Sequence, residues 1–211
     1  MNDKPNTGVI IESCLKAVAS QFPIVSGVAS LYADWKNQQE FNNIRALIQE
    51  HAKSLKNHED LIDKHYLETE DYIFTLHRTV DKAKNEIRES KKKLFADFLT
   101  QSCLIKNTEK SDKFIFLEIL DKVDIEHIKF LSYLNEKWNG MRNDIAIANA
   151  IIPKETGLTK ERVNFLIHYF ISIGLLVHYD DFEIKDDGDL WSDTKYYVSG
   201  LGSDFLEYLK E

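Results

Sequence analysis

Three histidines stand at intervals of seven residues in the first half of the chain, at His51, His58 and His65. On one continuous helix they would project from nearly the same face, where imidazoles bind metals or sense protons. Neighbours in this column would be about 10.5 Å apart at a rise of about 1.5 Å per residue, too far for two of them to ligate one ion at about 2.1 Å. We therefore predict that they pack along a helix seam, with metal binding left open only for symmetric pairing with a second copy. Protonation would then weaken the seam as the pH falls.

No other group of residues predicts catalysis. His58-Glu59 lacks the second histidine of a zinc-protease helix, because Ile62 occupies that position. The chain has no G-x-S-x-G motif, and Cys14 and Cys103 have no histidine close in sequence, so we interpret them as buried thiols. We predict a protein that is not an enzyme and that carries no cofactor and no metal.

One stretch of the chain is basic. It contains seven cationic residues against three acidic ones, a net charge of +4. The candidate contact residues are Arg78, Lys82, Lys84, Arg88, Lys91, Lys92 and Lys93. We favour a solvated helix face, and the functional alternatives are an acidic partner, RNA or lipid headgroups.

The N-terminal segment is apolar and rich in small residues. Its candidate membrane-contact residues are Ile10, Ile11, Phe22, Ile24, Val25, Leu31 and Trp35. A helix pair broken at Pro23 would pack in a bundle, which we favour, or enter a bilayer interface if released. The uncharged run 17–33 is too polar and too short for a stable membrane span, and Glu12 and Lys16 interrupt a signal-peptide core. We expect a cytoplasmic protein.

Composition limits the remaining classes. With 211 residues, 43% of them hydrophobic, the chain can form one large domain or two small ones. The net charge of −8 opposes non-specific attraction to nucleic acid and to anionic membranes. Two widely separated cysteines fit a reducing compartment better than a disulfide scaffold.

Long helices are predicted for the first half, because neither Gly nor Pro occurs between Val28 and Asn139. One heptad register contains Ile44, Ile48, His51, Leu55, His58, Ile62, His65 and Thr69. A second contains Ile73, Leu76, Val80, Ala83, Ile87, Lys91 and Leu94. The phase shift between them predicts a stutter or a break near residues 68–71. A helical hairpin or bundle is favoured over one very long helix, with homo-oligomeric pairing through the seam as the alternative.

The last part of the chain, from about residue 124, is predicted to form shorter capped helices and two strands. Asp124 is a predicted N-cap of a helix up to 138, and Thr159 caps a helix that Gly174 ends. Residues 175–184 and 191–198 read as two strands joined by a polar turn, and Ser199 caps a final helix. This order is typical of a winged helix. The predicted fold is mainly α, with a long helical bundle over 1–123 and a winged-helix domain with a two-stranded wing over 124–211.

The predicted wing and third helix do not suit DNA. The outward positions of the third helix are Lys160, Glu161, Asn164 and His168. The wing region has seven acids against two lysines, a net charge of −5. Its acids are Asp180, Asp181, Glu183, Asp186, Asp187, Asp189 and Asp193. Because phosphate binding requires positive charge, we do not expect sequence-specific duplex DNA binding.

Three blocks, at 91–134, 162–176 and 194–209, resemble the abortive-infection alpha family and related bacterial and prophage helical proteins. The shared pattern is a helix ending in a Gly-Leu-Leu turn, a returning strand and a Ser/Thr-x-x-Gly step into the last helix. The resemblance implies a role in phage defence or prophage biology and gives no catalytic residues.

These observations predict a non-enzymatic bacterial or phage protein that acts through protein–protein contacts. We expect self-association or a protein partner, with the winged helix as the interaction module. The first alternative is a membrane-perturbing abortive-infection effector that uses residues 7–35. The second is a winged-helix regulator that binds DNA.

Overall fold

The structure is a computed structural model that describes residues 38–138, 152–184 and 190–210. The chain is mainly helical with a small two-stranded antiparallel sheet, and its described residues form two compact units, one ending at Lys122 and the other spanning Val123–Lys210. The seven candidate membrane-contact residues named above and Cys14 lie outside the described residues. No helix in the described part of the chain is long and apolar enough to cross a membrane.

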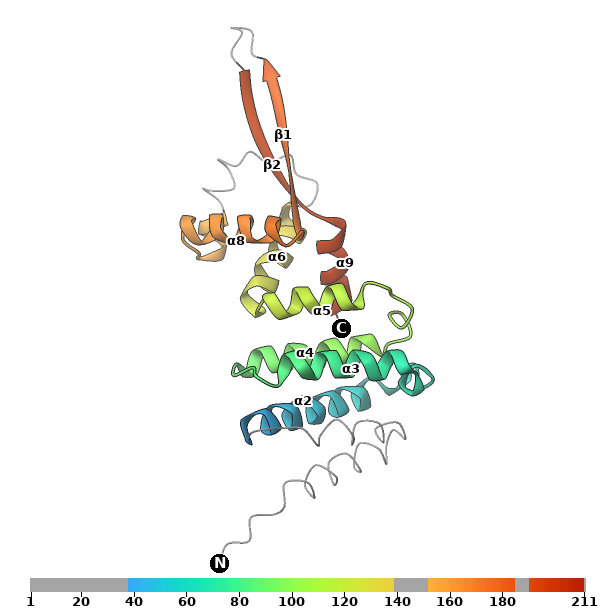
Figure 1. Ribbon diagram of the computed structural model, residues 1–211. Helices are drawn as coiled ribbons and strands as arrows, with labels where there is room; N and C mark the ends of the chain where they lie inside the picture. Colours follow the sequence, from blue (N-terminus) through green and yellow to red (C-terminus); the bar gives the residue numbers. More distant parts are fainter. Residues whose placement is uncertain (1–37, 139–151, 185–189, 211) are drawn as a thin grey trace, which may run out of the picture. The chain divides into compact units, whose positions relative to one another are not determined.

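The first unit is a helical bundle. Its main helices are α2 (Gln38–Asn57), α3 (Glu70–Ala83), α4 (Glu89–Ser102) and α5 (Lys113–Lys122). Helices α2, α3 and α4 pack against one another and α5 packs against α3 and α4 (Figure 1). The chain therefore folds back repeatedly, and the predicted bundle is confirmed.

The break between α2 and α3 occurs without glycine or proline. Helix α2 ends at Asn57, and two single 3₁₀ turns follow, η3 (Glu59–Leu61) and η4 (Tyr66–Glu68). The Asp63 carboxylate accepts hydrogen bonds from the backbone N–H groups of His65 and Tyr66, both at 3.0 Å. A carboxylate that accepts from the N–H groups two and three residues later caps the start of a helical turn, so Asp63 begins η4 rather than continuing α2. The break begins at His58, well before the predicted position near 68–71.

Helix α3 begins with a threonine cap, at a residue that the heptad register had placed in the seam. The Thr69 hydroxyl oxygen accepts a hydrogen bond from the Tyr72 N–H at 3.2 Å, and Glu70 and Asp71 favour the positive end of the helix dipole.

Backbone hydrogen bonds join two connections of the first unit. Ile62 and Leu104 form an isolated antiparallel bridge. The Asp63 N–H donates to the Cys103 carbonyl at 2.9 Å, and the Ile105 N–H donates to the Leu61 carbonyl at 3.0 Å. The α2–α3 connection is thereby fixed to the α4–α5 connection.

Most of the predicted seam residues are buried. Those with almost no exposed surface are Ile44, Ile48, His51, Leu55, Ile62, Leu76, Val80, Ala83 and Lys91. The prediction that Ile87 packs in the seam is wrong, because 78% of its surface is exposed. It lies in the connection between α3 and α4, where the helical phase is lost. A heptad register holds only while the helix is continuous.

The described part of the second unit contains three helices of ten or more residues and a β-hairpin. Its elements are α6 (Ile125–Trp138), a helical turn at 152–156, α8 (Lys160–Ser172), β1 (Leu176–Ile184), β2 (Leu190–Val198) and α9 (Gly200–Leu209). Helix α6 packs against α9 and β2, and α8 packs against β1. Figure 1 shows the hairpin extending away from α8 and α9.

The predicted caps of the second unit are confirmed. The side-chain oxygens of Asp124, Thr159 and Ser199 accept hydrogen bonds from N–H groups in the first turns of α6, α8 and α9. Gly174 adopts a φ of +78°, and the N–H of Leu175 donates to the carbonyl of Phe170 at 2.8 Å, which ends α8.

The strand pairing matches the predicted hairpin to within one residue at each strand. Leu176 pairs with Val198 beside the helices, and Ile184 pairs with Leu190 at the far end. Leu175, Leu176 and Gly202 are buried at the base of the hairpin, where α9 follows β2.

Candidate interaction surface

Helix α8 presents an aromatic and cationic stack to solvent. The ring of Phe165 lies parallel to that of Tyr169, with centroids 6.0 Å apart and an interplanar angle of 3°. The Arg162 guanidinium carbon lies 5.3 Å from the Phe165 ring centroid. Phe165 is nevertheless 54% exposed. We call Arg162, Phe165 and Tyr169 the α8 stack.

Sequence reasoning identified only part of this face. The predicted outward residues Lys160, Glu161, Asn164 and His168 are exposed, and the predicted apolar stripe on the opposite side is buried. Arg162 and Phe165 were missed, although neither belongs to the apolar stripe and the helical period alone leaves both outside it.

Helix α6 supports the inner end of the α8 stack. The His127 ring lies 5.4 Å from the Tyr169 ring and 6.1 Å from the Phe170 ring, measured between centroids. Its Nδ1 atom lies 2.6 Å from the Asp124 carboxylate, which fixes the imidazole. Burial and the negative charge of Asp124 raise the pKa of the Tyr169 hydroxyl, so this ring is neutral at physiological pH.

A cavity of about 440 Å³ adjoins the α8 stack, between α6, residues 155–158 and α8. Its lining residues are Glu126, Lys129, Phe130, Tyr133, Glu155, Thr156, Leu158, Arg162 and Leu166. Phe130 and Leu166 are buried and provide an apolar floor. The Tyr133 hydroxyl donates to the Glu155 carboxylate at 2.8 Å across the rim. Arg162 therefore belongs both to the cavity and to the α8 stack.

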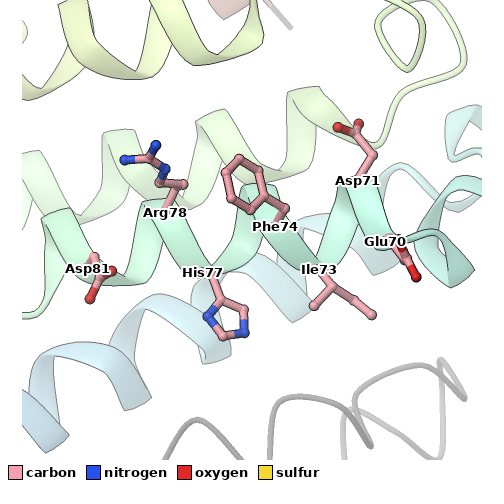
Figure 2. Close-up of a pocket in the computed structure, with 7 residues that line it drawn as sticks. All are labelled: Glu70, Asp71, Ile73, Phe74, His77, Arg78 and Asp81. Carbon is pink, nitrogen blue, oxygen red and sulfur yellow. The ribbon is translucent and has the colours of Figure 1, made fainter.

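A second hollow lies on the first unit. Its described lining residues are Glu70, Asp71, Ile73, Phe74, His77, Arg78 and Asp81, all from α3 (Figure 2). Figure 2 shows Asp71, Phe74 and Arg78 on one side of the helix and Ile73 and His77 on the other. Because these residues face in different directions, they do not converge on one point where a reacting group could be held.

The basic stretch does not form one exposed surface. Lys91 is buried, with its ammonium group donating to the Leu120 carbonyl and lying 5.5 Å from the Phe95 ring centroid. Lys92 is buried too and pairs with Glu89 at 2.7 Å. The expectation of a single solvated basic face is wrong for these two lysines, because Lys91 belongs to the buried heptad register and Lys92 beside it is buried as well.

The other basic residues of the stretch are divided among local pairs. Lys82 contacts Glu118 and Asp121, Lys84 contacts Asp81, and Arg88 contacts Glu86. Arg78 lies over the Phe74 ring at 5.3 Å, and Lys93 is exposed. Asp81, Glu86 and Glu89 are already included in the net charge of +4, and Glu118 and Asp121 from outside the stretch offset part of what remains. The pattern therefore does not strengthen the case for RNA or lipid binding.

His51 joins three helices through a buried polar network. Its Nδ1 atom lies 3.0 Å from the Thr100 hydroxyl, and its Nε2 atom lies 3.1 Å from the Tyr72 hydroxyl. The Thr100 hydroxyl donates to the Ala96 carbonyl at 3.0 Å, so its oxygen accepts from Nδ1–H of His51. Nε2 then accepts from Tyr72, and the imidazole is neutral with both nitrogens satisfied.

This network predicts an acid-dependent loss of stability in the first unit. Burial lowers the pKa of His51 from 6.5 to about 3, so between these values the unfolded chain binds a proton that the folded chain does not. Stability falls as the pH drops through that window, by about 2 kcal/mol between pH 7 and pH 5. Urea unfolding followed by circular dichroism should show this slope, and His51→Gln should remove most of it. His65→Gln is the control, and an equal loss of slope in both variants would contradict the assignment.

The other two histidines are not in the seam. His58 follows the end of α2, where its Nδ1 atom lies 2.9 Å from the Ser54 carbonyl, and His65 is an exposed residue just before η4. The predicted histidine column is therefore wrong, because the helix ends at Asn57 before the second member.

A buried lysine forms the other polar cluster of the first unit. The Lys113 ammonium donates to Asp71 at 2.6 Å, to the Tyr66 hydroxyl at 3.0 Å and to the Thr108 carbonyl at 2.8 Å. Burial would raise the pKa of Asp71, but hydrogen bonds from Lys113 and Tyr66 and the lysine charge hold it below its ordinary value. Burial raises the pKa of the Tyr66 hydroxyl well above its usual range. With all three lysine protons donated, the cluster has a structural rather than a nucleophilic character.

Cys103 is buried, as expected, and burial raises the pKa of its thiol to about 12, which disfavours the reactive thiolate. Within the described ranges, no three His, Cys, Asp or Glu side chains gather as metal ligands would. Comparisons of the chain with family models, with curated proteins and with solved structures found no match.

Proposed function

We propose that the protein acts through protein–protein contacts and that its second unit is a winged-helix module that docks onto a partner through α8. The observation that carries this proposal is the α8 stack. Arginine and aromatic residues dominate the binding energy of many protein interfaces, and an exposed ring held on both sides is ordered before it binds.

The charge of the second unit supports a protein partner over duplex DNA. On α8 the exposed cations Lys160 and Arg162 are accompanied by Glu161, and the hairpin sequence adds its net charge of −5. DNA-binding winged helices need cations on both elements to neutralise phosphates. The resemblance described above supports phage defence or prophage biology as the setting.

A photo-crosslinker at position 165 tests this function. Replacing Phe165 by p-benzoylphenylalanine keeps the aromatic ring, and the exposed Ile105 of the first unit is the control position. We expect a discrete protein adduct from position 165 in the native host and none of the same size from position 105. An adduct with a second copy of the chain would identify self-association, whereas adducts only with nucleic acid, or none, would contradict the proposal.

A substitution then measures how much the ring contributes. We expect Phe165→Ala to weaken binding of the captured protein about thirtyfold, equivalent to about 2 kcal/mol, as for an interface hot spot. Because the ring is largely exposed in the free protein, thermal stability should change little. Asn164→Ala, at the neighbouring exposed position, is the control for binding. Equal affinities of the two variants would exclude Phe165 as an anchor.

A further inference from the structure

The cavity and the α8 stack together form a patch that carries both a projecting ring and a hollow. We propose that two copies of the chain join through this patch about a twofold axis, with Phe165 of each copy entering the cavity of the other. This inference rests on the proposed function and names a second copy of the chain as the partner.

Phe165 is the projecting ring of the patch. It is 54% exposed, and it contacts the Arg162 guanidinium, at 5.3 Å from its centroid, and the parallel Tyr169 ring, at 6.0 Å. A ring that its neighbours already hold loses little side-chain freedom when a partner buries it. Phe165 is therefore suited to act as an anchor.

The cavity has the size and the floor for such a ring. Its volume of about 440 Å³ lies within the range of about 300–1,000 Å³ that is usual for pockets that hold small molecules. Phe130 and Leu166 are buried and form the floor, and Leu158 in the lining is partly exposed. A phenylalanine ring would displace water from this apolar floor and gain the hydrophobic contribution.

The ring and the cavity lie next to each other on the same unit. Arg162 lines the cavity and also lies over the Phe165 ring, and Leu166 of the cavity floor follows Phe165 along α8. In a twofold interface the same patch contacts itself, so a projecting group needs a matching hollow in that patch. One exposed ring beside one apolar hollow meets this requirement.

The charges around the cavity are balanced. Its lining contains the cations Lys129 and Arg162 and the carboxylates Glu126 and Glu155, all of them exposed, and we call these four the rim charges. The Tyr133 hydroxyl donates to Glu155 and leaves its charge unchanged, so the rim is neutral overall. None of the four forms an ion pair with another residue that the structure describes.

A balanced rim suits a second copy of the chain. A partner with charge of a single sign would meet like charges at half of these positions. A second copy brings two cations and two carboxylates of its own, and each can face its opposite across a twofold axis. The patch is therefore self-complementary in both shape and charge.

Sedimentation velocity of the full chain tests the pairing. Because each copy has a net charge of −8, the measurement is made at about 0.15 M salt, where charges more than about 8 Å apart are largely screened. We expect a reversible dimer with a Kd of about 1–100 µM, as for a small interface. A chain that remains monomeric up to about 500 µM would overturn the inference.

A substitution tests whether the ring joins the two copies. Because a twofold dimer contains the Phe165 contact twice, Phe165→Ala should weaken the dimer by about a hundredfold or more. Asn164→Ala, at the neighbouring exposed position, is the control and should leave the dimer unchanged. If both variants dimerise with equal affinity, the copies join through another surface and the inference is wrong.

Two rim variants test the charge pairing without requiring knowledge of which groups meet. The acidic variant combines Lys129→Glu with Arg162→Glu, and the basic variant combines Glu126→Lys with Glu155→Lys. Each variant would bring four like charges against four more, so we expect each alone to dimerise about tenfold more weakly or worse. An equimolar mixture of the two should recover a dimer at least as tight as that of the unchanged chain.

A matched control separates the rim from general charge. Lys137→Glu combined with Lys154→Glu changes the net charge by the same amount as the acidic variant. Both lysines are exposed and neither lines the cavity. This control should dimerise like the unchanged chain. If it weakens the dimer as much as the acidic variant does, the rim charges have no specific role and the proposed pairing is wrong.

The inference and the proposed function fail in different ways. If the chain is monomeric but the crosslinker at position 165 captures another protein, the function stands and a second copy is excluded as the partner. If the chain dimerises but the mixed rim variants do not pair, the twofold arrangement is wrong, while crosslinking at position 165 still reports on docking. Adducts only with nucleic acid, or none, would contradict the proposed function itself.

Discussion

Replacing Asp71 by alanine should lower the free energy of unfolding of the first unit by about 2–3 kcal/mol, which is less than for a fully buried ion pair because Asp71 itself is partly exposed to water. Only 5% of the Lys113 side chain is exposed, against 46% of Asp71. Without the carboxylate, the Lys113 ammonium would retain the Tyr66 hydroxyl and the Thr108 carbonyl as acceptors of its protons, and both are neutral. A buried cation without a counter-charge is strongly unfavourable.

Removing the other partner of the ion pair, Lys113, should destabilise the protein less, and the difference between the two losses of stability is the test. Lys113→Met keeps most of the apolar stem and leaves Asp71 where water can reach it, so we expect a loss of about 1 kcal/mol. Urea unfolding of the two variants at pH 7, followed by far-UV circular dichroism, gives both values. If Lys113→Met destabilises the protein as much as Asp71→Ala, a buried lysine without a counter-charge is not the main cause of the loss of stability.

The pH range of this ion pair differs from that of His51. Because the pKa of Asp71 is held below its ordinary 3.8, the contribution of the ion pair is complete above that value and is lost as the pH falls through the lowered pKa. The loss expected from His51 begins near pH 6.5. Between pH 7 and pH 5, the slope therefore reports on the histidine and not on Asp71.

Gly202→Ala should destabilise the second unit by about 2–3 kcal/mol, as overpacking of a close contact does. A Cβ atom at this position would lie 2.5 Å from the Leu175 carbonyl oxygen and 2.9 Å from a Val198 methyl group. Since the nearer atom belongs to the backbone at the end of α8, α9 or the strands must move to admit it. Both contacts lie at the base of the hairpin.

Gly200 provides a control within the same first turn of α9. A Cβ atom there would meet nothing within 4 Å, so Gly200→Ala should be neutral or stabilising by up to about 1 kcal/mol through helix propensity. Hydrogen exchange in α6 and α9, together with urea unfolding, measures both variants. Similar stabilities of the two alanine variants would show that α9 does not pack closely on Leu175.

The sequence was most informative where local interactions decide the structure. The caps at Asp124, Thr159 and Ser199 could be predicted because each depends on residues within one helical turn. The break after Asn57 could not be located, because the connection that follows it is held by backbone bonds to Cys103 and Ile105, which are distant in sequence.

The candidate site was only partly predictable for the same reason. The buried stripe of α8 defined its exposed face, and closer use of the helical period would have included Phe165. The cavity combines residues of α6, 155–158 and α8, so no spacing along the chain indicates it. Lys91 belongs to both the heptad register and the basic stretch, which predict burial and exposure respectively. Its burial shows that the heptad register was the better guide at this position.

The bridge between Ile62 and Leu104 constrains how this chain can change during evolution. Because the two connections on either side of it share backbone hydrogen bonds, their lengths are not independent. An insertion or deletion within 58–69 would shift Leu61 and Asp63 away from their partners unless 103–112 changed with it. Length changes in descendants of this chain should therefore accumulate in the 84–88 connection, or occur in compensating pairs at the two bridged ones.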